Sequence, residues 1–160
     1  MAPSRRNFIR TASLFAAASV IPGENKIFSA TGVSANDRIN VAMIGGYGMG
    51  WNDLVSFLKN PEVECVALCD VDRNVLNRRT DDLIKLGYKR PKLYVDYRYM
   101  LENKDIDAVI IGTPDHWHCL ILCDALEAGK HAYAEKPVGN SIAEIDIIQK
   151  AVRKHGKIVQ

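Results

Sequence analysis

The strongest constraint on the fold is an alternation that runs from Ile39 to the end of the sequence. Short runs rich in Val and Ile alternate with stretches in which apolar residues recur at helical spacing. Each helix carries the chain back across one face of a sheet, so successive strands pair in parallel. The first, second, fourth and fifth runs lack polar alternation, which indicates that both faces are covered. We therefore expect an α/β fold with a doubly wound parallel sheet.

The bounds of the expected elements follow from this alternation. The expected strands are Ile39–Gly45, Val63–Asp70, Lys92–Val95, Ala108–Gly112, His131–Glu135 and Lys157–Val159. The expected helices are Met49–Lys59, Arg73–Leu86, Tyr97–Glu102, His118–Ala128 and Ile142–His155, with Gly87, Gly129 and Gly156 where C-terminal caps are common. The sequence ends as the last strand begins, so residues 36–160 are interpreted as one domain truncated in its sixth strand.

Composition limits the domain count and the classes of partner. The 160 residues, 48% of them apolar, suffice for one globular core and leave no room for two full domains. Residues 1–35 carry four basic side chains and one acidic one, which leaves residues 36–160 at −1 of the chain's net +2. A nucleic-acid partner is not expected, because that surface needs clustered basic charge.

The first 35 residues have the layout of an export signal. Arg5 and Arg6 precede the short, moderately apolar run Thr11–Val20, which is typical of a twin-arginine signal peptide and too short to span a membrane. Small side chains before and at Ala35 favour cleavage after that residue. We expect residues 1–35 to be removed and the protein to be periplasmic or otherwise exported. The alternative is a frayed N-terminal helix with two chance arginines.

The four cysteines form two pairs, each with a spacing of four residues. Cys65 and Cys69 fall in an apolar, strand-like run, where thiols behave as small hydrophobic side chains. Core packing is the favoured interpretation, and no metal site is predicted. The alternative is a metal site that combines Cys119 and Cys123, which share a helical face, with a nearby histidine.

A glycine cluster directly follows the first expected strand and opens the first helix. Gly45 and Gly50 match the outer positions of the G-x-G-x-x-G fingerprint, while Tyr47 occupies the middle one. Gly46 or Gly48 must then allow the close backbone approach that a pyrophosphate requires at a helix N-terminus. In this context we interpret the domain as a Rossmann domain and the cluster as its dinucleotide-binding turn. The alternative is a tight turn without a ligand.

Asp70 closes the second expected strand about twenty residues after the glycines. A carboxylate at this place hydrogen-bonds the adenosine ribose, and its charge repels the 2′-phosphate of NADP. NAD is therefore the expected cofactor. Arg73 follows three residues later and would pair with a 2′-phosphate, so NADP stays open. Taken alone, Asp70 also fits a surface aspartate at a strand end.

Two further stretches follow strands and complete a family pattern. Gly112–His118 reads G-T-P-D-H-W-H after the fourth strand, and Glu135–Pro137 reads E-K-P after the fifth. With the glycine turn and the acidic residue, this order over about residues 38–160 resembles the Gfo/Idh/MocA oxidoreductase family. Carboxyl ends of parallel strands form the ligand crevice, so we expect both stretches to face a cofactor.

The resemblance assigns roles to individual residues. It implies that Thr113, Pro114 and His118 line the cofactor cleft and that Trp117 lies against the nicotinamide. Glu135 is counted with the cofactor-binding residues and is expected to orient its neighbour.

Lys136 would be the family's catalytic lysine beside the reacting carbon, where an ammonium stabilises a developing oxyanion. The alternative for Glu135 and Lys136 is a solvated surface ion pair.

The resemblance also implies what a complete protein does. Family members carry a second α/β domain that holds most of the substrate, and none of it is present here. The leading hypothesis is an NAD(P)-dependent oxidoreductase acting on a sugar, polyol or related hydroxyl compound, with this chain inactive alone and homo-oligomers possible at full length. Some exported members cleave glycosides instead, using a retained NAD to oxidise a sugar carbon transiently. A cofactor-binding module without turnover is the third hypothesis.

The proposed export signal, residues 1–35, supplies a first test. Replacing Arg5 and Arg6 with Lys is expected to hold the protein in the cytoplasm, because the paired arginines are the feature that the twin-arginine route reads. Cell fractionation of the parent and the double variant measures this, with Arg10→Lys as the matched control. Unimpaired export of the double variant would contradict the interpretation.

Overall fold

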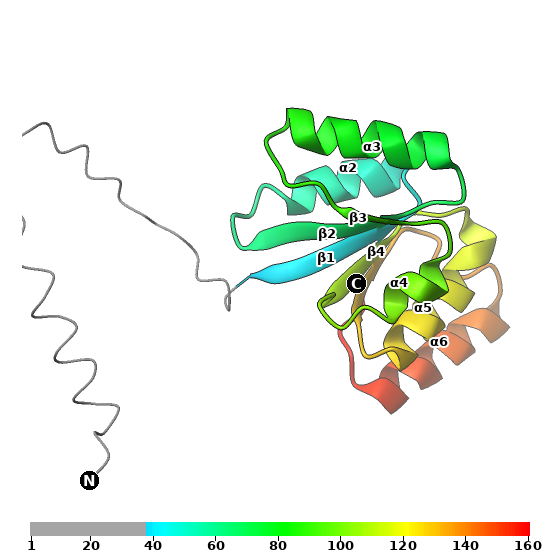
Figure 1. The fold of residues 1–160 in the computed structure, drawn as a ribbon. Coiled ribbons are helices and arrows are strands. Elements are labelled where there is room, and N and C mark those ends of the chain that lie inside the picture. The colour runs from blue at the N-terminus through cyan, green and yellow to red at the C-terminus, as the bar shows by residue number, and fades with distance from the viewer. Residues whose placement is uncertain (1–37) are drawn as a thin grey trace, which may run out of the picture. The chain divides into compact units, whose positions relative to one another are not determined.

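The computed structural model describes residues 38–160, which form a five-stranded parallel sheet (Figure 1). The strands are β1 (Ile39–Ile44), β2 (Val63–Cys69), β3 (Lys92–Tyr94), β4 (Ala108–Ile111) and β5 (His131–Ala134). Their order is β3-β2-β1-β4-β5, and all neighbours are parallel. The chain starts in the middle of the sheet and reverses its winding between β1 and β4. This is the doubly wound arrangement expected from the sequence, with its switch point at that pair.

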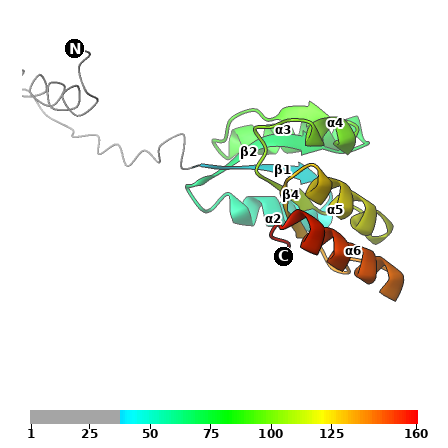
Figure 2. The same cartoon turned by 90° about the horizontal axis from the view of Figure 1, so that it is seen from below.

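Helices cover both faces of the sheet. The helices are α2 (Gly48–Phe57), α3 (Arg73–Lys85), α4 (Tyr97–Leu101), α5 (His118–Glu127) and α6 (Ile142–His155), with a 3₁₀ turn, η2, at Asp115–Trp117. Helices α2 and α3 lie on one face and α4, α5 and α6 on the other (Figure 1). Figure 2 shows α5 and α6 side by side along that second face.

Strand β1 explains why the strand-like runs are apolar throughout. Its residues alternate between two cores: Val41 and Met43 pack beneath α2 and α3, whereas Ala42 and Ile44 pack beneath α4, α5 and α6. All four side chains are at most 3% exposed. Where a strand is buried on both faces, neither face favours a polar side chain. Its sequence is therefore a continuous apolar run instead of an alternation of apolar and polar residues.

Local signals place the helix ends within two residues of the expected bounds. Asp72, Asp96 and Ser141 accept hydrogen bonds from the first turns of α3, α4 and α6. Gly87, Gly129 and Gly156 have positive φ angles of 88°, 79° and 61° after α3, α5 and α6, as expected for left-handed caps.

The expected sixth strand is represented by a single parallel bridge between Ala132 of β5 and Val159. The amide of Gln160 donates to the Ala132 carbonyl at 3.0 Å. Residues 158–160 thus pair with the β5 edge, and a complete sixth strand stays a prediction.

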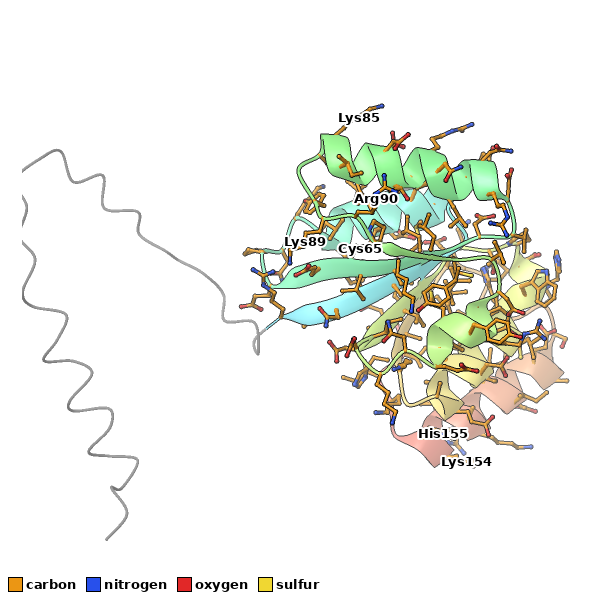
Figure 3. All side chains as sticks on the ribbon, viewed as in Figure 1. Cys65, Lys85, Lys89, Arg90, Lys154 and His155 are labelled. Atoms are coloured by element: carbon orange, nitrogen blue, oxygen red, sulfur yellow. The ribbon has the colours of Figure 1, made fainter. Side chains whose placement is uncertain are left out.

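Cys65 and Cys69 lie in the core, as expected (Figure 3 labels Cys65). Burial raises the pKa of each thiol to about 12. On α5, the Cys119 thiol contacts the Glu144 carbonyl of α6 at 3.8 Å. Within residues 38–160 no three side chains are grouped so as to hold a metal ion.

The end of the domain where the strands begin carries surface ion pairs. Glu64 on β2 pairs with Arg38 at 2.6 Å and with Lys89 at 2.7 Å. These hydrogen bonds, that to Lys89 foremost, lower the pKa of Glu64. Figure 3 shows Lys85 and Lys89 at this end. These two basic side chains are therefore far from the carboxyl ends of the strands.

No helix within residues 38–160 has the length and apolar character needed to cross a membrane. The proposed export signal, residues 1–35, lies outside the described part of the chain.

Candidate functional site

The candidate site is a crevice at the carboxyl ends of the strands, where the loops after β1, β2 and β4 meet. A cavity of about 590 Å³ opens there. Five of the residues singled out in the sequence line it: Gly45, Asp70, Thr113, Pro114 and Trp117. Residues that sequence reasoning missed complete its walls, among them Val71, Val95, Tyr97 and Leu120. The topology therefore brings together motifs that are up to 72 residues apart.

Three backbone segments meet at the floor of the crevice without side chains between them. Gly45 has φ = 89°, and a Cβ atom on it would lie 2.7 Å from the Gly112 carbonyl carbon and the Thr113 nitrogen. A Cβ atom on Gly50 would strike the Gly45 oxygen, and one on Gly112 would strike Gly50. Gly45 and Gly50 thus fill the turn and helix-packing roles of the fingerprint's outer glycines.

Gly46 and Gly48 have different surroundings. A Cβ atom on Gly46 would lie 2.7 Å from Cγ1 of Val75, so Gly46 packs against α3. Gly48 has φ = 53°, and nothing lies within 4 Å of its Cβ position. Of the two candidates for close ligand approach, Gly48 is therefore the one that faces open space. Tyr47 has an extended backbone with φ = −92°, which any residue adopts, so the fingerprint's middle glycine is not needed here.

The start of α2 is uncapped by any side chain. Its N-cap residue, Tyr47, makes no capping hydrogen bond, and no acidic residue stands in its first turn. By contrast, α3, α4 and α6 each have a capping Asp or Ser. The free amide groups and the positive dipole end of α2 form a place for an anionic ligand, on the same turn as the exposed Gly48.

Asp70 stands at the end of β2 with both carboxylate oxygens engaged. Oδ2 accepts a hydrogen bond from the Gly46 amide at 2.8 Å, and Oδ1 accepts one from the Asp72 amide at 2.9 Å. Each oxygen retains a further lone pair for a ribose hydroxyl. Asp70 therefore couples the end of β2 to the glycine turn at the cavity. Arg73 is exposed in the first turn of α3.

Thr113 carries an unpaired polar atom at the cavity. Its Oγ1 is buried and has no hydrogen-bond partner within the described residues. A buried hydroxyl without a partner costs stability. The uncapped start of α2 and the glycine contacts fit an anionic ligand such as a dinucleotide, and Gly45, Asp70 and Thr113 line the cavity.

The placement of His118 corrects an expectation. His118 is 2% exposed, and its Nδ1 and Nε2 lie 2.8 Å and 2.7 Å from the carbonyl oxygens of Pro137 and Thr113. It therefore does not line the cavity itself. It ties the loop after β4 to the Lys136–Pro137 segment after β5, because the ring lies between both carbonyls. The sequence placed His118 at the start of a helix as a polar residue, but it did not indicate that the side chain is buried.

Trp117 is 45% exposed and, with Pro114, forms a wall of the cavity that also contains Asp70. A contact between Trp117 and the nicotinamide stays a prediction.

Glu135 and Lys136 are not paired with each other, contrary to the expectation. Within residues 38–160 no ion pair joins them, and Lys136 is exposed after β5. Glu135 instead faces Asp53 on α2. Burial and the adjacent Glu135 carboxylate raise the pKa of Asp53, whose Oδ2 has no partner in this part of the chain. The negative charge nearby makes the protonated form of Asp53 more favourable.

A sequence model of an oxidoreductase family with an NAD-binding Rossmann fold matches residues 39–160. The chain belongs to this family, Gfo/Idh/MocA. The fold, the family and the cofactor class inferred from the sequence are thereby confirmed.

The relatives include enzymes with two kinds of name. A glycosyl hydrolase family 109 protein of Shewanella baltica is 33% identical over 159 residues, which cover 88% of this chain and 35% of that protein. An α-N-acetylgalactosaminidase of Shewanella oneidensis is 33% identical over 134 residues, which cover 80% of this chain and 29% of that protein. Scyllo-inositol dehydrogenase of Lactobacillus casei, solved with NAD(H) and scyllo-inositol, has a TM-score of 0.67 and 26% identity over 77% of this chain and 35% of that one. The chain spans about a third of the length of the curated relatives it matches.

The carboxyl pair supplies a test by pH. A raised pKa means that the folded state holds the Asp53 proton more tightly than the unfolded chain, so ionising it above about pH 4 costs stability. Asp53→Asn removes that charge and donates to Glu135. We expect a melting temperature a few degrees above the parent at about pH 7, with the gain shrinking towards about pH 4.

Thermal unfolding followed by circular dichroism measures the difference at several pH values. Asp81→Asn, an exposed aspartate on α3, is the matched control and should show no such gain. An Asp53→Asn variant that melts at or below the parent at neutral pH would refute the raised pKa of Asp53.

Proposed function

We propose that this chain is the cofactor-binding part of an NAD-dependent oxidoreductase that acts on a sugar, a polyol or a related hydroxyl compound. The observation that carries the proposal is the crevice at the switch point. There the Gly45 backbone and the Asp70 carboxylate line one cavity, and the uncapped start of α2 follows on the same glycine turn. The relatives crystallised as inositol dehydrogenases support the substrate class.

The chemistry assigns distinct tasks to this chain's residues. Bound NAD supplies the hydride acceptor. The amides at the start of α2 would hold the pyrophosphate, and Asp70 the adenosine ribose. Lys136, after β5, would stand beside the carbinol, where its ammonium stabilises the oxygen as the C–H bond gives up its hydride and the hydroxyl its proton. The products of that step are a carbonyl compound, reduced cofactor and a proton.

A second candidate is a glycosidase that regenerates its NAD. The observation that favours it is the name of the curated relatives, glycosyl hydrolase family 109 and α-N-acetylgalactosaminidase, at 33% identity. Transient oxidation of a sugar carbon acidifies the proton on the neighbouring carbon, which permits elimination of the glycosidic oxygen. The first hydride transfer is common to both candidates, so the cofactor site described above serves either.

Net redox change separates the candidates. With the chain continued to the length of its relatives, a dehydrogenase accumulates reduced cofactor in proportion to carbonyl product. A glycosidase releases sugar from a nitrophenyl glycoside while the absorbance of the reduced cofactor stays constant. The 160-residue chain itself is expected to bind dinucleotide weakly and to turn over neither substrate.

We also propose that the protein is exported by the twin-arginine route. The support is Arg5 and Arg6 ahead of a short apolar run. That route carries folded proteins, which would allow the cofactor to be bound before export.

Cofactor choice is expected to depend on Asp70. Asp70→Asn keeps an oxygen for the Gly46 amide but removes the charge that repels a 2′-phosphate. NAD should bind about tenfold more weakly, because the ribose loses a hydrogen bond to a charged group, which contributes about 1.5–3 kcal/mol. The affinity for NADP should not fall. Isothermal titration calorimetry of both cofactors measures this, with Asp81→Asn as the charge-matched control. Tighter binding of NADP than of NAD to the parent would show that Arg73 governs the choice.

Lys136 is expected to act in turnover and not in cofactor binding. In the protein continued to the length of its relatives, Lys136→Ala should lower kcat about 100- to 10,000-fold while the Kd for NAD changes little. The exposed Lys150 on α6 offers a control, Lys150→Ala, that should leave both values unchanged. A kcat for Lys136→Ala within about threefold of the parent would make Lys136 a surface residue only.

A further inference from the structure

The Gly46 residue of the dinucleotide turn is held from two sides. Its amide donates to Oδ2 of Asp70 at 2.8 Å, and its carbonyl accepts from Nε of Arg79 at 2.8 Å. Arg79 lies on α3, 33 residues further along the chain. Gly46 is buried between these two partners. The turn is therefore fixed by side chains of β2 and α3 as well as by its own backbone conformation.

Arg79 is itself fixed in place. Its guanidinium lies 4.6 Å from the centre of the Trp51 ring on α2, and its Nη1 pairs with Oδ2 of Asp82 at 3.0 Å. The side chain is only 17% exposed. A planar guanidinium that stacks on an aromatic ring while donating from its edge has few alternative positions. Arg79 thus presents a rigid donor to the Gly46 carbonyl and spans from α3 to α2.

Peptide geometry carries this restraint into the next residue. The carbonyl and the amide of a trans peptide point in opposite directions. The hydrogen bond from Arg79 to the Gly46 carbonyl therefore directs the Tyr47 amide away from α3. Tyr47 precedes the uncapped first turn of α2, whose amides form the anion site. Fixing this peptide sets the donors of that site before a ligand arrives.

We propose that Arg79 is a positioning residue of the dinucleotide site, which holds the Gly46–Tyr47 peptide in the orientation that pyrophosphate binding requires. This accounts for a departure from the fingerprint: Tyr47 stands where a glycine is usual, and Arg79 fixes the Gly46–Tyr47 peptide while Asp70 fixes the preceding peptide through the Gly46 amide. The inference rests on the dinucleotide site proposed above and adds a residue that the glycine motif does not contain.

The test combines ligand binding with a measurement that needs no ligand. Arg79→Gln removes the donor and its charge, and Arg79→Lys keeps the charge and the aliphatic stem but loses the planar donor. Arg90→Gln is the matched control, since Arg90 is exposed in the loop before β3. We expect both Arg79 variants of the 160-residue chain to bind NAD about tenfold more weakly, and the control to stay within about twofold, by calorimetry.

Amide hydrogen exchange, followed by nuclear magnetic resonance without NAD, is the second readout. The Arg79 variants should exchange faster at Gly46 and Tyr47 while amides of β1 and β4 keep the parent's rates, because only the turn is released. Faster exchange throughout the domain would show a merely structural role and overturn the inference, as would unchanged exchange at the turn. A parent that fails to bind NAD would refute the proposed function, and the exchange comparison would still decide the role of Arg79. If Arg79→Gln does not fold, Arg79→Lys decides both readouts.

Discussion

The site depends on the contact of three glycine backbones, Gly45, Gly50 and Gly112, at the carboxyl ends of β1 and β4. No side chain fits between them, so the turn after β1, the start of α2 and the end of β4 approach to backbone contact. This contact sets how far the first turn of α2 stands from the sheet and so creates the floor of the crevice. A methyl group at any of the three would push these segments apart and displace the first turn of α2 from the ends of β1 and β4.

Around this floor, the loops are joined by polar contacts that reach across the sheet. Asp70 links the end of β2 to the glycine turn, and Arg79 links the same turn to α3. His118 links the loop after β4 to the segment after β5 that carries Lys136. The cofactor loops and the proposed catalytic lysine are therefore one connected assembly. Displacement of one loop is resisted by hydrogen bonds anchored in another, which is how a rigid sheet positions reactive groups on loops.

The described residues carry the candidate cofactor site that both proposed functions need. A dehydrogenase and a glycosidase that regenerates its NAD both begin by moving a hydride from a carbinol carbon, and both need the cofactor held in one orientation. The later steps of each reaction depend on groups that face the rest of the substrate. Such groups are expected on a second domain, so the cofactor half alone is compatible with both reactions.

The sequence by itself determined the features that rest on local signals. The spacing of apolar residues established the strands and helices, and glycines marked the helix caps. The order of the glycine turn, Asp70 and the two later motifs established the family. Each of these signals is a matter of spacing along the chain. Tertiary structure decided what depends on distant neighbours. Three contacts between separate elements illustrate this. Arg79 donates to the Gly46 carbonyl, and His118 is buried between two carbonyls. Glu135 faces Asp53 instead of Lys136. No spacing rule encodes them, because packing of the helices on the sheet sets where each side chain ends.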